Sequence, residues 1–329
     1  MVLKLCTVGC GQFAELCHGP VQRSRAESER DVELAGCCDQ AKDRAEHFRQ
    51  RFGYARAYDD VSGMLAAERP DALVVAVPPA VTARVAAPIF AAGIPVLLEK
   101  PPGLDSGELA ALQKAAEAGK TRVQVAFNRR YMPVIVEAQR RLARWGEAAV
   151  SRIEYAMVRR ARFNEDFSTT AVHAIDALLH LARSPLAAVE LRFQVQREGE
   201  QSVINVELRG ETRSGIQLFL AVLPNGGSNR ETAVIHGRGR RLHVDIPASP
   251  LANEPGTLTE SAEGKPSAAY TDATSHTGML DRMGIAGEFA AFLAGVPSGA
   301  ALSPCLADCA PAVALMAAMR AGQTHPSIA

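Results

Sequence analysis

The sequence has no excess of charge of either sign, no long apolar run and few aromatic residues. Lys plus Arg and Asp plus Glu each number 36, so no global charge draws the chain to nucleic acid or to an anionic membrane. The apolar stretches at 72–81 and 309–319 fall short of the ~20 residues that a transmembrane helix needs. No basic segment followed by a signal-type apolar stretch opens the chain. We therefore expect a cytoplasmic protein that binds neither nucleic acid nor membrane.

The cysteines follow no metal-ligand spacing, and their number, seven, is odd. Cys305 and Cys309 are four residues apart, but no second pair or nearby histidine completes a zinc site. Cys6, Cys37 and Cys38 fall in expected strands, where a reduced cysteine behaves as a small hydrophobic residue. We expect no metal.

The length and composition indicate two globular domains. The chain has 329 residues, of which 47% are hydrophobic and 22% charged, enough to bury a core. Residues 1–127 alternate apolar strands with helical patterns, and the run at 72–77 is typical of a strand buried on both faces. Such alternation predicts an N-terminal Rossmann domain, an α/β fold with a parallel sheet. Its strands are expected at 2–8, 32–38, 72–77, 95–98 and 122–127.

The pattern changes after residue 127, and residues 128–329 are expected to form a C-terminal substrate-binding and oligomerisation domain. Helices are expected near 133–144 and 168–182, and period-two segments predict strands. Short links between those strands predict an open, mostly antiparallel or mixed sheet. The stretch 247–275 is predicted to be a long loop, and two helices, near 281–293 and 303–321, close the chain. The terminal helix 303–321 is a candidate to pack back on the first domain. The expected strands are 149–159, 188–196, 202–208, 216–223, 231–236 and 241–246.

A glycine turn near the N-terminus predicts a dinucleotide site. Gly9, Gly11 and Ala14 follow an expected strand and open a helix, which is the context that this fingerprint requires. Gly9 permits the tight turn, Gly11 lets the backbone approach a pyrophosphate, and Ala14 allows close helix–strand packing. Gln12 and Phe13 lie between them and are expected to contact the cofactor.

The end of the second strand bears on cofactor choice. Asp39 can accept hydrogen bonds from the ribose hydroxyls and repels a 2′-phosphate, which favours NAD, while Lys42 and Arg44 leave NADP possible. Asp39 lies further from Gly11 than is usual, and a loop over 23–31 is expected to absorb the excess. Pro78 and Pro79 end the third strand and are expected to shape the loop beneath the nicotinamide.

With these motifs in hand, the sequence resembles the Gfo/Idh/MocA oxidoreductase family, which includes glucose-fructose oxidoreductase and inositol dehydrogenase. The resemblance covers nearly the whole chain, and its most specific part is the Glu-Lys-Pro segment. It is carried by the glycine turn, Ala76–Pro79, Ala92–Pro101, Asn128–Tyr131, His173 with Asp176, and Ser303–Pro304.

The resemblance implies hydride transfer at a carbinol of a sugar, cyclitol or related substrate, with Lys100 as the proton shuttle. An ordinary lysine has a pKa near 10.4, so Lys100 needs its ammonium disfavoured, by desolvation and by the positive nicotinamide ring. The Lys100–Pro101 bond is expected to be cis, and Glu99 to brace the site through the cofactor or a neighbouring helix. A homodimer or homotetramer through the C-terminal sheet is also implied.

A second region supplies further candidates on one helix. His173, Asp176 and His180 share a helix stripe, and His173 is expected to assist proton transfer, with a core histidine as the alternative. The family places an aspartate four residues before the histidine, whereas this chain has Thr169, and Glu165 or Asp166 of the preceding loop is a candidate substitute for that aspartate.

The roles on this helix and near the domain junction remain open. Asp176 is interpreted mainly as structural, and His180 as packing or polar support. The expected substrate-binding residues are Asn128, Arg129, Tyr131, Thr169, His173 and Asp176, with an interdomain salt bridge as the alternative for Arg129. Arg159, Arg160 and Arg162 form a basic run, which is interpreted as a solvated face, with binding of an acidic or phosphorylated substrate as the alternative.

Three functions remain open from the sequence. The first is an NAD(P)-dependent dehydrogenase or reductase of a sugar-like hydroxyl or ketone. The second, suggested by Thr169, is a dinucleotide-binding regulator that has lost turnover. The third is a reductase of an imine or double bond, for which the missing carboxylate matters less.

Overall fold

The computed structural model describes residues 2–146, 149–247, 254–275 and 278–327. The chain forms two compact units, each with a sheet of its own. The first contains residues 1–127 and 285–310, and the second contains residues 128–284 and 311–329.

The sheet of the first unit has six parallel strands in the order β3-β2-β1-β4-β5-β6. This order confirms the predicted Rossmann-type sheet. From β1 the next strands are added toward β3 on one side and, after β3, toward β6 on the other side, so the strand order reverses between β1 and β4. Ligands of such sheets bind beyond the carboxyl ends of the strands at this point. The strands are β1 (Leu3–Val8), β2 (Val32–Cys38), β3 (Arg56–Tyr58), β4 (Ala72–Val75), β5 (Val96–Glu99) and β6 (Val123–Ala126).

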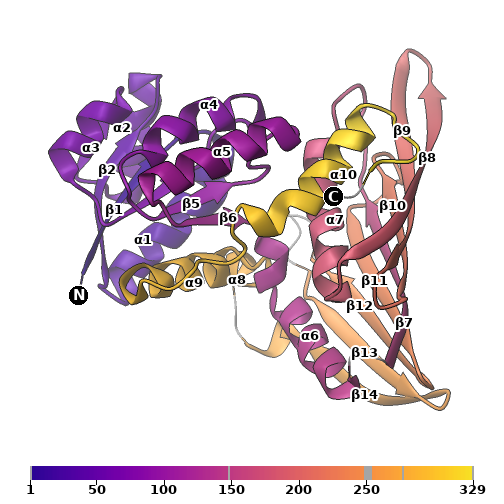
Figure 1. The fold of residues 1–329 in the computed structure, drawn as a ribbon. Helices are drawn as coiled ribbons and strands as arrows, with labels where there is room; N and C mark the ends of the chain where they lie inside the picture. Colours follow the sequence, from indigo (N-terminus) through magenta and orange to yellow (C-terminus); the bar gives the residue numbers. More distant parts are fainter. Residues whose placement is uncertain (1, 147–148, 248–253, 276–277, 328–329) are drawn as a thin grey trace. The chain divides into compact units, whose positions relative to one another are not determined.

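Helices cover both faces of this sheet, with α1 and α9 on one side and α4 and α5 on the other (Figure 1). Asp60 and Asp105 cap α3 and α5, since their carboxylates accept from Gly63 N and Glu108 N. The elements are η1 (Ala14–His18), α1 (Gly19–Ser28), α2 (Lys42–Phe52), α3 (Val61–Glu68), α4 (Pro79–Phe90), α5 (Ser106–Gly119), α9 (Ile285–Ser298) and η5 (Ala307–Cys309).

The segment after the glycine turn differs from expectation. It begins as one turn of π-helix, η1, and continues as α1 to Ser28, so the loop predicted over 23–31 is wrong. Arg23 and Glu27 pair across one turn at 2.7 Å, and Arg25 bonds to Asp31 just beyond the helix. The longer helix, not a loop, accounts for the long separation of Gly11 and Asp39. The short elements β3 and α3 were also absent from the prediction.

The sheet of the second unit has eight strands in the order β14-β13-β12-β11-β7-β10-β9-β8. The pair β10–β7 is parallel and the other pairs are antiparallel, which confirms the predicted open, mostly antiparallel sheet. The strands are β7 (Val150–Val158), β8 (Leu186–Glu198), β9 (Gln201–Thr212), β10 (Gln217–Leu223), β11 (Arg230–Gly237), β12 (Arg240–Ile246), β13 (Thr257–Ala262) and β14 (Lys265–Thr271).

The helices of this unit pack on one face of its sheet (Figure 1). Helix α7 contacts β7 and β10, and α6 contacts β12 and β13. Buried Ile153, Tyr155 and Met157 alternate along β7 with residues of the other face, as strand geometry requires. The elements are η2 (Asn128–Tyr131), α6 (Pro133–Trp145), α7 (Ser168–Ala182), η4 (Asp272–Ser275), α8 (Met279–Arg282) and α10 (Ala310–Arg320).

Two expectations about the C-terminal third were wrong. Strands β13 and β14 occupy much of the stretch predicted as a loop, and residues 248–253 of that stretch lie outside the described residues. The final helix, α10, begins at Ala310 rather than near 303, and residues 311–329 group with the second unit. Among the described residues, no helix is both long and apolar enough to cross a membrane.

Candidate functional site

The glycine turn joins β1 to η1 in the conformation that its residues permit. Gly9 has φ +93°, and a Cβ there would lie 2.1 Å from the carbonyl oxygen of Ala76. Only glycine fits such an approach. A Cβ on Gly11 would meet nothing within 4 Å, so the space beside this backbone is open.

A cavity of about 260 Å³ lies beyond the carboxyl ends of β1, β4 and β5. Three segments that the sequence singled out line it together. They are Gly11–Ala14 of the glycine turn, Ala76–Pro79 after β4, and Glu99 with Lys100 at the end of β5. The first unit therefore brings together Gly11, Gln12, Phe13, Ala14, Pro78, Pro79, Glu99 and Lys100.

Glu99 is held by a histidine that the sequence analysis missed. Buried His18, the last residue of η1, lies 2.7 Å through Nε2 from Oε1 of Glu99, and Oε2 accepts from the backbone N of Lys100. This contact links the helix after the glycine turn to the strand end that carries Lys100. The position of His18 in that helix and the unexplained carboxylate of Glu99 were the available signals. Lys100 is half-buried, and the Lys100–Pro101 bond is cis.

Asp39 faces the glycine turn from the end of β2. Its carboxylate accepts from the backbone N of Cys10 at 3.0 Å and of Ala41 at 2.9 Å, and Arg44 Nε lies 3.2 Å away. The turn and this carboxylate are thus held in one arrangement.

The Cys10 thiol lies inside the turn and carries no charge at neutral pH. A hydrogen bond with Cys37 and burial both raise the pKa of Cys10. A neutral thiol at this place adds no repulsion toward a phosphate.

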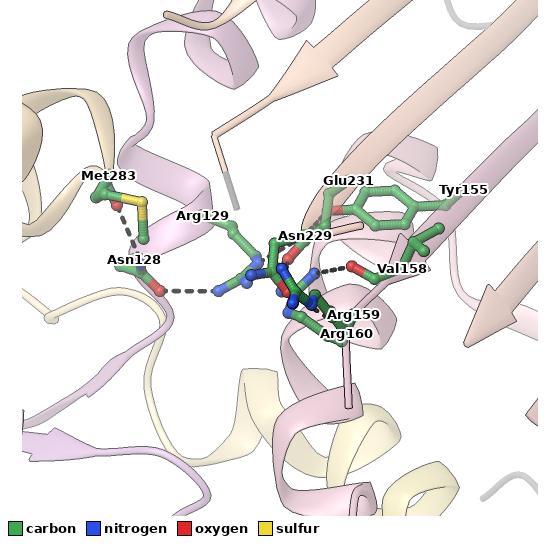
Figure 2. A network of polar contacts seen from close by, with 9 residues as sticks. All are labelled: Asn128, Arg129, Tyr155, Val158, Arg159, Arg160, Asn229, Glu231 and Met283. Atoms are coloured by element: carbon green, nitrogen blue, oxygen red, sulfur yellow. Dashed lines mark hydrogen bonds and ion pairs between the residues drawn. The ribbon is translucent and has the colours of Figure 1, made fainter. Parts of the chain in front are cut away.

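The segment after β6 is held inside the second unit. Asn128 is buried, and its side-chain amide donates to the carbonyl of Met283 at 2.8 Å. Arg129 forms a two-pronged ion pair with Glu231 of β11, with N–O distances of 2.9 and 2.5 Å. Arg159 also binds Glu231, and the Tyr155 hydroxyl donates to it at 2.5 Å (Figure 2).

The part of the network around Glu231, which also contains Arg129, Tyr155 and Arg159, is buried and carries two guanidinium groups for one carboxylate (Figure 2). Burial alone would raise the pKa of Glu231, but the charges of Arg129 and Arg159 outweigh it and lower that pKa to about 2. Burial, and next the Glu231 charge, raise the pKa of Tyr155 well above its ordinary value. Arg129 is thus paired within the second unit, and Arg159 is buried rather than part of a solvated face.

Helix α7 carries the second group of predicted residues. Thr169 and His173 are half-buried, and the Thr169 hydroxyl donates to the Asp166 carbonyl at 3.4 Å. Asp176 is buried and forms a two-pronged ion pair with Arg130 of η2, at 2.6 and 2.9 Å. Tyr131, the last residue of η2, is half-buried.

The two loop carboxylates before α7 have arginine partners. Glu165 pairs with Arg162, and Asp166 lies 2.7 Å from Arg320 Nε while accepting from Ser168 N at 3.1 Å. His180, near the end of α7, is largely buried. That burial, with the charges of Arg130 and Arg183, lowers the pKa of His180 to about 4. It is therefore neutral at pH 7.

The glycine turn, the parallel sheet and the cavity agree with a family profile described as "Oxidoreductase family, NAD-binding Rossmann fold", which matches residues 3–127. That part of the chain is therefore similar to the Gfo/Idh/MocA family. A named relative is inositol 2-dehydrogenase of Corynebacterium glutamicum (strain R), 30% identical over 146 residues. The match spans 42% of this chain and 43% of that protein, so the chain covers less than half of its length.

Solved structures resemble the chain over nearly its whole length. A dehydrogenase from Chromobacterium violaceum superposes with a TM-score of 0.80 at 19% identity, covering 96% of this chain and 93% of the other. Levoglucosan dehydrogenase in complex with NADH and levoglucosan gives 0.82 at 15% identity, covering 98% and 97%. At such identities the likeness establishes the fold of both units.

Proposed function

We propose that this protein is an NAD(P)-dependent oxidoreductase that transfers hydride to or from a sugar, cyclitol or related hydroxyl or ketone. The observation that carries the proposal is the cavity shared by the glycine turn, Ala76–Pro79 and Lys100. The inositol 2-dehydrogenase relative supports the substrate class, and the family match of residues 3–127 supports the cofactor.

The residues present fit a dinucleotide. Gly11 leaves open space for a pyrophosphate, the N-terminus of η1 offers backbone N–H groups, and Asp39 stands at the ribose end of the turn. A bound nicotinamide would accept or supply the hydride. Asp39 favours NAD over NADP because a carboxylate repels a 2′-phosphate. The contact of Asp39 with Arg44 leaves a positive group at hand for NADP as the second cofactor.

Lys100 is the proposed proton shuttle. In the oxidation direction, the substrate hydroxyl gives its proton to neutral Lys100, and a bound nicotinamide would take up the hydride from the substrate carbon. The reduction direction reverses both transfers. Glu99, held by His18, fixes the strand end from which the lysine extends. His173 is proposed to assist proton transfer, and Asn128, Arg129, Tyr131, Thr169 and Asp176 to bind or to shape the substrate site.

The ion pairs of Arg129 and Asp176 favour a shaping role for these two residues. Each holds η2 against another element of the second unit, β11 or α7. Thr169 can hydrogen-bond a substrate hydroxyl but cannot hold a charge. Glu165 and Asp166 are each paired with an arginine, which argues against either carboxylate replacing the aspartate that the family has at the position of Thr169.

We further propose that the protein is a homodimer or homotetramer that associates through the second sheet. On the face of this sheet opposite α7, half-buried Ala156, Phe219, Ala221 and Val234 lie on three adjacent strands. A second copy that covers these side chains would remove apolar surface from water.

Activity of wild-type protein and Lys100→Met tests the function. Sugars, inositols and sugar acids are supplied with NAD⁺ or NADP⁺, or their ketones with NADH or NADPH, and the reduced nicotinamide is followed by absorbance. We expect turnover by the wild type that falls by about a hundredfold or more in Lys100→Met. Lys114→Met, an exposed lysine on α5, is the matched control and is expected to keep full activity.

Fluorescence titration with NADH separates the alternatives. Tight NADH binding without turnover of any substrate in the panel would favour the regulator. Turnover of an imine or a double bond alone would favour the third function. Activity that survives Lys100→Met would overturn the lysine mechanism, and absence of NADH and NADPH binding would overturn the whole proposal.

A further inference from the structure

A second cavity, of about 510 Å³, lies entirely within the second unit. Its apolar walls come from β9, β10 and α10, through Val203, Ile204, Val206, Val222 and Met319. The loop before α7 and the first turns of that helix close it. Ligand cavities of this size have mostly apolar walls and a few well-placed polar groups.

This cavity is separate from the predicted catalytic residues of α7. The residues of α7 that line it are Ser168 and Ala171, whereas Thr169 and His173 are not among them. Ala171 is turned from Thr169 by roughly 200° about the helix axis, at 100° per residue. The cavity therefore lies against the opposite side of the helix.

The loop that closes the cavity is held in a strained conformation. Ala161 has φ +55°, which is costly for a residue other than glycine, and Asn164 has φ +52°, a conformation that asparagine adopts more readily. Ala161 N donates to the Asn225 side chain, and Asn164 exchanges backbone and side-chain hydrogen bonds with Ser202 of β9. The cavity wall is thus formed before any ligand arrives.

The polar rim carries charges that are already balanced. Arg162 pairs with Glu165, and Arg320 pairs with Asp166, so the four charged lining residues sum to zero. An anion or a cation would have to compete with these pairs, whereas hydroxyls can bond to their remaining lone pairs and N–H groups. The rim favours a neutral ligand with hydroxyls.

One wall residue is unusually exposed for its type. Ile204 is 53% exposed, and so is its cross-strand partner Val195, at 57%. Ile204 lines the cavity and Val195 does not. An apolar ligand group that covered Ile204 would remove this side chain from water.

We propose that this cavity binds a neutral, amphipathic hydroxylated molecule, of the class of glycosides with an apolar aglycone, apart from the residues predicted for catalysis. The hydroxyls bind the paired charges of the rim, and the apolar part packs on β9 and β10. The proposal stands on the second unit alone and does not depend on the proposed oxidoreductase activity.

Calorimetric titration with phenyl β-D-glucoside tests it, using the full chain without cofactor. We expect binding by the wild type, at least tenfold weaker binding by Ile204→Asp, and unchanged binding by Val195→Asp. The two variants place the same charge on paired, exposed positions, so their contrast isolates the cavity. Methyl β-D-glucoside, which lacks the apolar ring, is expected to bind the wild type more weakly than the phenyl compound.

Three outcomes would overturn the proposal. They are no binding of phenyl β-D-glucoside by the wild type, equal affinity in the two variants, or equal affinity for the methyl and phenyl compounds. Circular dichroism confirms that both variants are folded, as their exposed positions lead us to expect. Nicotinamide turnover by Ile204→Asp is measured separately, so that failure of this site and failure of the catalytic proposal give different results.

Discussion

At the scale of single residues, the second unit contains two charged or titratable groups whose environment has measurable consequences. Glu231 stays ionised in the interior because two arginines face it, and His180 stays neutral because it is buried beside positive charge. Each group links local geometry to the stability of the whole unit.

Glu231→Gln is expected to destabilise the protein strongly. Loss of the carboxylate leaves Arg129 and Arg159 buried side by side without a counter-charge, which costs about 3–5 kcal/mol of the free energy of unfolding. Urea unfolding measures the change. Glu207→Gln, at an exposed position of β9, is the control and should change stability by less than about 0.5 kcal/mol. Equal effects of the two substitutions would contradict the assigned role of the network.

His180 is expected to make stability fall with acid. Its pKa of about 4 in the folded protein lies below the ordinary 6.5, so the unfolded chain takes up this proton first. Between these two values stability therefore decreases as pH falls, by up to about 3 kcal/mol. The stabilisation is present above pH 6.5 and gone below pH 4.

Urea unfolding from pH 7 to pH 4 checks this slope. His180→Gln should flatten the fall, because the titrating group is gone, while His325→Gln, at an exposed position of the same unit, should keep it. A wild-type slope that persists in His180→Gln would show that other groups cause it.

The residues that line the first cavity could be predicted from the sequence, but the buried ion pairs of the second unit could not. The glycine turn and the Glu99–Lys100 strand end are local motifs, so their neighbourhood could be predicted from fold rules. Arg129 and Glu231 are 102 residues apart, and the other partners of this carboxylate, Tyr155 and Arg159, reach it because β11 pairs with β7. A glutamate near the start of a strand gives no local sign that it will be buried.

At the scale of elements, the two glycines of the turn are expected to serve different purposes, Gly9 the fold and Gly11 the binding of the dinucleotide. A Cβ on Gly9 collides with backbone, whereas a Cβ on Gly11 meets only open space. Gly11→Ala should therefore leave the melting temperature nearly unchanged yet weaken NADH binding at least tenfold, because the added methyl group occupies the approach of the pyrophosphate. Gly9→Ala should lower the melting temperature itself.

Thermal unfolding and NADH fluorescence titration measure both effects in parallel. Gly11→Ala with full NADH affinity would show that the pyrophosphate does not bind at this turn. Gly9→Ala with wild-type stability would show that the turn relaxes around a side chain.

Elements with a clear apolar pattern were predicted correctly, and elements without one were not. The buried runs of β4 and β5 show their strand character in four residues each, since both faces are covered. Strands β13 and β14 consist mostly of Thr, Ser and Ala, and β14 lies at the sheet edge, so neither shows an apolar alternation. The π-helical turn η1 depends on packing rather than on helix propensity, and no sequence pattern predicts it.

At the scale of the whole molecule, association through the second sheet is testable. Ala221→Arg places a charge at the centre of the face opposite α7, where a partner copy would bury it, and is expected to convert oligomers to monomers. Gln194→Arg, on the same face of the sheet near its edge strand end, is the control. Analytical ultracentrifugation of the three proteins gives the answer, and a monomeric wild type would refute the predicted assembly.

The buried network around Glu231 also constrains how the sequence can change over time. Removing one member leaves an uncompensated charge, but apolar side chains of similar volume at all three charged positions can pack without loss. Positions 129, 159 and 231 should therefore vary together among descendants of this chain. A lineage that replaces these three charged residues by apolar ones must change three codons that are widely spaced in its gene. The intermediates, with one or two charges removed, would fold poorly and would be selected against.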